Sequence, residues 1–170
     1  MFGKKNKKPN GAAPENNVKK SEKELKKETE SKIADYEESI KACKESIETE
    51  LKALKIAASN LKVSSKSVSR VKGIFTEKVR KKKKYADRIS AYEESLEEYI
   101  RISSHINWLI NTVSSCYEAD ARLNEELKKY RQARKIRINA RKYVAKVNYK
   151  KSKLEKCADG IVMPVTNYVR

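Results

Sequence analysis

The sequence predicts an all-α protein: a long, coiled-coil-like helical hairpin, elongated, with a flexible basic N-terminal tail. Two observations carry this prediction. Positions 15 to 163 contain no proline, and Gly73 is the only glycine between Ala12 and Asp159, so this long stretch holds almost nothing that breaks a helix. Apolar residues also recur at seven-residue spacing over most of it, which is typical of helices that pack along a narrow seam.

The first helix is expected to follow a flexible basic tail, residues 1–20. Ser21 and Glu24 form a capping-box pattern, in which the Ser21 hydroxyl accepts from the Glu24 amide and the Glu24 carboxylate reaches back. An isoleucine or leucine then stands at every seventh position: Ile33, Ile40, Ile47, Leu54 and Leu61. Tyr36, Cys43, Leu51 and Ala58 fill the half-steps. This single apolar stripe needs a partner to cover it.

The second half of a hairpin over 21–127 is expected after a turn near 63–69, because VSSKSVS is rich in side chains that compete with helix hydrogen bonds. Two further heptad rows follow, starting at Val68 and Val71, and 13 of their 18 positions are apolar or aromatic. Polar residues interrupt these rows, where we expect a bend, an exposed stretch or a helix break: Lys78, Lys82, Ser103, Asp120 and Asn124. An antiparallel hairpin would cover both seams, and a self-associating coiled coil is the alternative.

The last helix is expected over 128–158, with a thinner apolar stripe formed by Ala133, Ile136, Ala140, Tyr143, Val147 and Leu154. The pair Asp159-Gly160 indicates a helix C-cap. The segment 159–170, interrupted by Pro164, is therefore expected to be a short extended tail.

The charge is strongly basic and unevenly distributed. Lys and Arg number 41 against 23 Asp and Glu, a net charge of +18. Residues 89–127 carry eight acidic and two basic side chains, whereas residues 128–156 carry 13 basic and one acidic. Such a concentration of like charge repels itself unless something acidic neutralises it. An anionic partner is therefore expected: a membrane surface, a nucleic acid or an acidic protein face.

The sequence offers no catalytic or metal-binding constellation, so a non-enzyme without cofactor or small-molecule substrate is expected. His105 is the only histidine, and we expect it to be partly exposed with no fixed acid nearby. Cys43 lies on the first apolar stripe, where a small core residue is the natural interpretation. Three widely spaced cysteines and no secretory signal favour a reducing, cytoplasmic location. No apolar run is long enough to span a bilayer.

The candidate residues for binding an anionic surface fall into three groups. The N-terminal arm combines an apolar tip with lysines: Phe2, Lys4, Lys5, Lys7 and Lys8. A second cluster comprises Arg80, Lys81, Lys82, Lys83 and Lys84. The C-terminal helix contributes Arg131, Arg134, Lys135, Arg137, Arg141, Lys142, Lys146, Lys150 and Lys151. Tyrosines interleaved with this last group would suit stacking on bases as well as contact with phosphates.

The chain also resembles the ESCRT-III family of membrane-remodelling subunits. It opens with Met-Phe-Gly-Lys-Lys, and KVRKKKKYADRISAYEESLEEYI (78–100) is similar to the lysine-rich start of the family's second helix, while IETELKALK (47–55) is similar to the end of its first. The resemblance covers about residues 1–110 and implies a scaffold that binds and remodels membranes. The chain departs from the family in its basic C-terminal half, so autoinhibition and ATPase recruitment do not carry over.

Two functions therefore remain open. One is a cytoplasmic scaffold that lies peripherally on an anionic membrane and self-associates. The other is a helical nucleic-acid-binding protein that uses 128–156, nuclear if the source is eukaryotic. For self-association, we expect the acidic block 89–127 of one copy to pair with the basic block 128–156 of the next, because an unclosed head-to-tail contact propagates.

Overall fold

A computed structural model describes residues 21–69 and 83–166, and all the regular structure in this part is helical. The helices are α1 (Glu22–Ser69), α3 (Lys83–Glu126) and α4 (Tyr130–Thr166). The all-α prediction is confirmed. The tail expected at 1–20 and the heptad positions between 70 and 82 lie outside the described residues.

The start of α1 confirms the capping box. The Ser21 amide donates to a Glu24 carboxylate oxygen at 2.9 Å, and the Glu24 amide donates to the Ser21 hydroxyl at 3.3 Å. The Ser21 amide, which would otherwise lack a partner at the helix end, is thereby satisfied, and the Glu24 amide gains a second acceptor besides the Ser21 carbonyl at 3.0 Å.

The turn expected at 63–69 is wrong, because these residues form the last two turns of α1. Val68 is 3% exposed and continues the heptad row of Leu61 by one more step. Ser64 donates its hydroxyl to the Leu61 carbonyl at 3.1 Å, a bond made within the helix. The Ser64 hydroxyl is therefore satisfied within the helix, and burial of Val68 outweighs the weak local preference of the serines for a turn.

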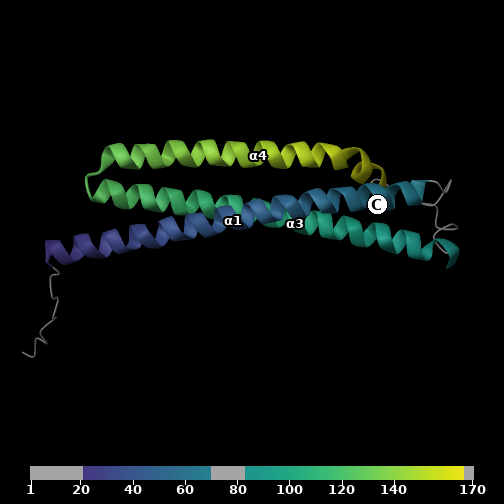
Figure 1. Ribbon diagram of the computed structural model, residues 1–170, viewed down its shortest axis with the longest axis horizontal. Coiled ribbons are helices and arrows are strands. Elements are labelled where there is room, and N and C mark those ends of the chain that lie inside the picture. Colours follow the sequence, from purple (N-terminus) through teal and green to yellow (C-terminus); the bar gives the residue numbers. More distant parts are fainter. Residues whose placement is uncertain (1–20, 70–82, 167–170) are drawn as a thin grey trace, which may run out of the picture.

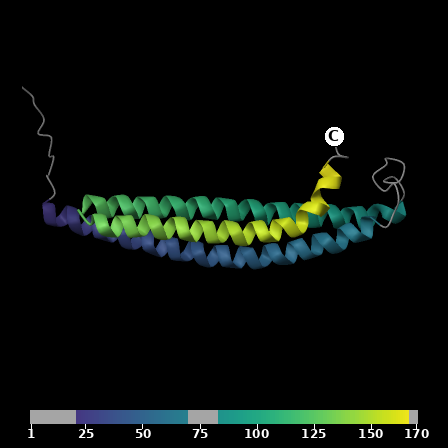
Figure 2. The ribbon, with the colours of Figure 1, turned by 90° about the horizontal axis from the view of Figure 1, so that it is seen from above.

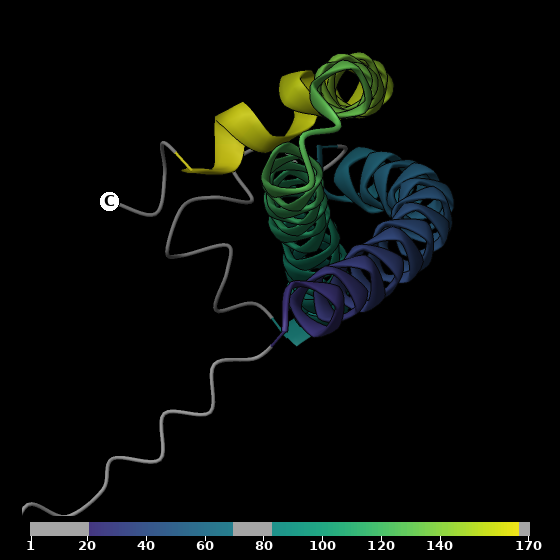
Figure 3. The ribbon, with the colours of Figure 1, turned by 90° about the vertical axis from the view of Figure 1, so that its left-hand side faces the viewer.

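The three helices form an elongated bundle in which α3 runs antiparallel to α1 and α4 returns along α3 (Figure 1). Seen from one end, they occupy the corners of a triangle (Figure 3). The antiparallel hairpin is thus present, and α4 packs against both of its helices as the third helix of the bundle. At 1.5 Å per residue, the 48 residues of α1 span about 70 Å.

The core follows the heptad rows read from the sequence. In α1 the five isoleucine and leucine positions are all buried, and Leu54 has no exposed surface. In α3 Tyr92, Tyr99, Ile106 and Val113 are buried against them. Removing a side chain such as Leu54 or Ile106 leaves a cavity that costs about 2–5 kcal/mol.

The polar interruptions of the α3 rows do not produce the expected bend, exposed stretch or break at the described positions. Ser103 is half-buried and donates to Glu155 of α4 at 3.0 Å. Asp120 and Asn124 are 3% and 0% exposed, and the Asn124 amide donates to the Asp120 carboxylate at 2.8 Å. The Ser103 hydroxyl thus finds its partner on α4, and the Asn124 amide finds its partner within α3, so these donors are satisfied without a bend or break of the helix.

The chain reverses between α3 and α4 at Lys128, whose φ is 60°. The Lys129 amide donates to the Asn124 carbonyl and the Lys128 amide to the Glu125 carbonyl, each at 2.8 Å. This is the Schellman arrangement that ends many helices with one left-handed residue. It places the start of α4 directly beside the end of α3, so α4 must run back along the hairpin.

The extended tail expected from residue 159 is also wrong for residues 159–166, which continue α4. These last turns bend away from the axis of the helix (Figure 2). Gly160 and Pro164 belong to this part of α4, and both residue types loosen or kink a helix without necessarily ending it.

Candidate anionic-surface interface

The outer face of α4 carries a row of exposed cations along its length. The inner face is occupied by Ala133 and Val147, which are buried, and by the partly buried side chains between them. Basic residues at the remaining helix positions therefore face solvent. We call them the cationic stripe: Arg131, Arg134, Lys135, Arg141, Lys142, Lys146, Lys153 and Lys156.

The cationic stripe is long and has no acidic partner within the described part of the chain. It covers 26 positions of one continuous helix, about 40 Å at 1.5 Å per residue. Tyr149 lies among these cations with 69% of its surface exposed, and Ile138 with 41%. The stripe thus offers charge together with two apolar or aromatic side chains on a rigid support.

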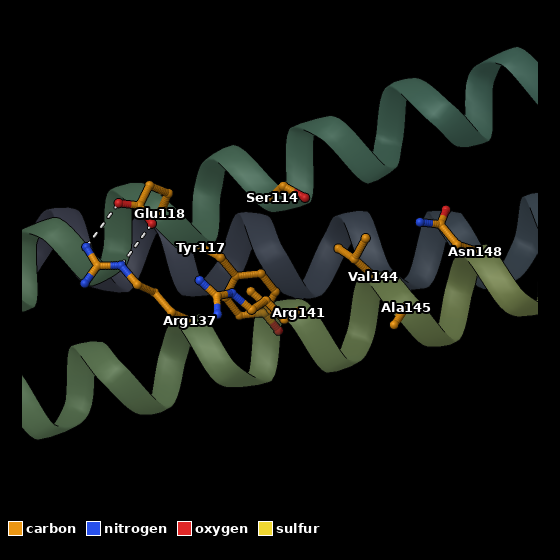
Figure 4. Close-up of a pocket in the computed structure, with 9 residues that line it drawn as sticks. Ser114, Tyr117, Glu118, Arg137, Arg141, Val144, Ala145 and Asn148 are labelled. Carbon is orange, nitrogen blue, oxygen red and sulfur yellow. Dashed lines mark hydrogen bonds and ion pairs between the residues drawn. The ribbon is translucent and has the colours of Figure 1, made fainter.

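Three of the predicted basic residues are instead used to hold α4 on the hairpin. Arg137 places Nε 3.1 Å from Glu118 Oε2 (Figure 4). Its Nη2 lies 3.1 Å from Glu125 Oε2. Its two hydrogen-bonded partners raise the pKa of Arg137, and the guanidinium in turn lowers the pKa of both carboxyls. The side chain is therefore committed to an internal cluster.

Lys150 and Lys151 make the other two contacts. Lys150 Nζ lies 2.8 Å from Glu48 Oε1 of α1. Lys151 is 7% exposed and donates to Glu155, which also accepts from Ser103 of α3. Lys151 is buried, which does not fit the prediction that it contacts an external surface. Lys150 joins α4 to α1, and 40% of its side chain remains exposed.

The other two predicted groups cannot be placed in this interface. Phe2, Lys4, Lys5, Lys7, Lys8, Arg80, Lys81 and Lys82 lie outside the described residues. Lys83 and Lys84 belong to the first turn of α3, at the end of the bundle away from the α3–α4 turn (Figure 1).

Sequence reasoning singled out neither Lys153 nor Lys156, although both lie in the strongly basic block. The signal that identifies them is helical spacing. Lys153 stands seven residues after Lys146 and Lys156 stands 15 residues after Arg141, so both return to nearly the same face.

An aromatic contact links all three helices beneath the stripe. Lys44 Nζ of α1 lies 5.1 Å from the ring centroids of both Tyr117 of α3 and Tyr143 of α4. Burial raises the pKa of Tyr143 to about 12, so its hydroxyl stays protonated at neutral pH. Contacts of this kind contribute about 0.5–2 kcal/mol each and add to the docking of α4.

A groove of about 420 Å³ runs between α3 and α4 beside the Arg137 cluster. Tyr117, Val144 and Ala145 line it, and Arg141 lies at its edge (Figure 4). Its lining is mostly apolar, and the charged side chains Arg137 and Glu118 in it are bonded to each other. The groove is therefore better explained by packing between the helices than as a catalytic site.

His105 differs from expectation. Its Nδ1 lies 2.9 Å from Glu50 Oε1 of α1, and its ring stacks on Trp108. A fixed acid is therefore present, contrary to the sequence prediction, because the antiparallel partner helix brings it there. Trp108 is 60% exposed, so the pair lies at the edge of the α1–α3 interface.

Other site types have little support in the described residues. They contain no group of three or more His, Cys, Asp or Glu side chains that could hold a metal ion. None of the three helices contains a segment long and apolar enough to cross a membrane. Cys43 and Cys116 are free and partly buried, and burial raises the pKa of the Cys116 thiol.

Comparison with known proteins adds no identity: the chain matches no family model, no curated protein and no solved structure. The function must therefore be argued from the fold and from the cationic stripe.

Proposed function

We propose that this protein is a non-enzymatic, cytoplasmic scaffold that lies on an anionic membrane surface through the cationic stripe and associates with further copies of itself. The observation that carries the proposal is the stripe: eight cations along one helix that have no acidic partner among residues 21–69 and 83–166. Each basic residue held near an anionic leaflet contributes about 1 kcal/mol. A row of eight therefore supports firm, salt-sensitive binding without any inserted segment.

Two further features favour a lipid surface. The exposed Ile138 and Tyr149 would meet the headgroup region, where aromatic and apolar side chains partition. The likeness of residues 78–100 to a membrane-remodelling family points the same way. Phe2 and the lysines around it would add a second contact, since one weak anchor needs another to hold.

Charge reversal in the middle of the stripe tests the proposal. The triple variant K135E/K142E/K146E should bind vesicles containing phosphatidylserine at least about 100-fold more weakly, because three contributions of about 1 kcal/mol are lost and then reversed. Co-sedimentation with vesicles over a salt series measures this.

The matched control changes the same charge on another helix. Lys23, Lys41 and Lys62 are exposed lysines of α1 outside the stripe, and K23E/K41E/K62E should retain most of the binding. Equal binding by the two triple variants, or equal pelleting of the native protein with neutral vesicles, would refute the proposal.

A nucleic acid is the second candidate, favoured by the tyrosines of α4. Tyr149 stands between Lys146 and Lys153 with 69% of its surface exposed, and Tyr130 beside Arg131 with 64%. Exposed aromatic rings among cations suit stacking on single-stranded bases. A titration with single-stranded RNA and with duplex DNA should then show a log–log salt slope of several units. Nucleic-acid binding without vesicle binding would select this function over the first.

A further inference from the structure

A second groove, between α1 and α4, combines an apolar floor with a cluster of lysines. Its volume is about 360 Å³. Leu51 of α1 and Leu154 of α4 line its floor, and the exposed Tyr149 lines one side. All of these residues are outside the Arg137 cluster described above.

The ion pair at one end of this groove neutralises only part of its charge. Lys150 Nζ lies 2.8 Å and 3.1 Å from the two carboxylate oxygens of Glu48. Three more lysines line the groove, namely Lys52, Lys55 and Lys153. They are exposed and make no ion pair within the described part of the chain, so three positive charges stay uncompensated.

The two helices hold these three lysines in a defined arrangement. Lys52 and Lys55 are three residues apart on α1, which makes them neighbours on one helix face. The Lys150–Glu48 bond joins α4 to α1, and Lys153 of α4 lines the same groove as Lys52 and Lys55 of α1. Cations on both walls therefore surround one space above an apolar floor.

We propose that the α1–α4 groove binds the headgroup of a membrane lipid that carries a phosphomonoester. Three unpaired lysines match a phosphate of nearly two negative charges better than the single charge of a phosphodiester. The leucine floor would accept the apolar part of the lipid next to the headgroup. Lys153 belongs to both the groove and the cationic stripe, so the groove opens beside the face that would lie on the bilayer.

This inference rests on the proposed membrane function and adds the class of lipid. Its test uses two kinds of vesicle matched for total negative charge: phosphatidylcholine with phosphatidylserine, and phosphatidylcholine with phosphatidic acid. The native protein should bind the phosphatidic acid vesicles several-fold more tightly. The variant K52Q/K55Q should lose this preference and keep its binding to phosphatidylserine, which the stripe supplies.

A matched control separates the groove from general charge. K41Q/K62Q removes two exposed lysines of the same helix that do not line the groove, and it should keep the preference. Lysine and glutamine have similar helix propensity, and far-ultraviolet circular dichroism confirms that both variants fold.

The outcomes are distinct. Equal binding to the two vesicle types by the native protein, or a preference that persists in K52Q/K55Q, would overturn the groove assignment while the membrane function stands. Failure to bind either vesicle would overturn both.

Discussion

At the scale of single residues, Asp120 shows how burial changes an ordinary side chain. Burial raises its pKa most, nearby Glu37 raises it further, and the hydrogen bond from Asn124 lowers it. The carboxylate is only 3% exposed, so its ionised form is poorly solvated in the folded state. The ionised Asp120 side chain therefore lowers the stability of the fold at neutral pH rather than adding to it.

The variant D120N should therefore be more stable than the native protein at pH 7. Because the pKa of Asp120 is raised in the folded protein, this side chain contributes most to folding stability when it is protonated, at pH values below its pKa in the unfolded chain. That contribution is lost as the pH rises through the pKa of the folded state. The gain in D120N should shrink as the pH falls. Thermal unfolding over a pH series measures it.

The control is D35N, which neutralises an exposed carboxylate of α1 and should change stability little. A D120N variant that is less stable than the native protein at pH 7 would show that the charged form makes a contact that outweighs its desolvation.

At the scale of elements, α4 is held on the hairpin by a few specific polar contacts as well as by its apolar stripe. Arg137 joins Glu118 and Glu125 of α3, and Lys44 lies against the rings of Tyr117 and Tyr143. Glu118 and Glu125 belong to the last turns of α3 and Arg137 to the first turns of α4, so this cluster lies toward the end of the bundle where α3 turns into α4 (Figure 1). These contacts fix the direction in which α4 leaves the turn and hence which of its cations face outward.

Replacing Arg137 should weaken the docking of α4 in a pH-dependent manner. Because the pKa values of Glu118 and Glu125 are lowered, their contribution is present above their ordinary pKa and is lost as the pH falls through the lowered values. R137Q should therefore unfold at a lower temperature than the native protein at pH 7, and the difference should disappear in acid.

Arg141 supplies the comparison, since it stands one turn further along α4 and is exposed. R141Q should leave thermal stability nearly unchanged at every pH. A constant difference between R137Q and the native protein across the pH range would mean that packing, not the carboxylates, causes the loss.

At the scale of the whole molecule, the charge is divided between faces. Glu118 and Glu125 of the acidic block 89–127 form intramolecular ion pairs with Arg137. Four other acidic side chains of α3 form an exposed cluster in the first half of that helix, and one of them, Glu98, is bonded to Arg101: Glu93, Glu94, Glu97 and Glu98. We propose that this cluster, rather than the whole block, meets the cationic stripe of a second copy.

Self-association should then depend on salt and on this cluster. Exposed ion pairs contribute at most about 1 kcal/mol each and are screened by salt, so light scattering should show mass growing with concentration only at low ionic strength. Replacing the four glutamates with glutamine should abolish the growth. Growth that is unchanged in this variant would point to an apolar contact between copies.

Deleting 128–170 would not test this contact between copies. In the folded chain Val147 and Leu154 of α4 cover the hairpin core, so the truncated chain would expose an apolar surface and associate for that reason alone.

The sequence by itself determined the helices and most of the core. The near absence of proline and glycine, the capping box at Ser21 and the heptad rows are local or periodic signals, and each is borne out in the described residues. Local signals failed at 63–69 and at Asp159-Gly160, where the helices continue.

Only the tertiary structure decided which polar residues face the outside. Packing of α4 on the hairpin engages Arg137 and Lys150 in ion pairs with α3 and α1, buries Lys151, and leaves the cationic stripe exposed. The same packing of antiparallel helices places Glu50 beside His105. The ion pairs of α4 with the other two helices join residues 12 to 102 positions apart in the sequence. A helical period shows which residues share a face of one helix, but not which residues of another helix lie opposite them.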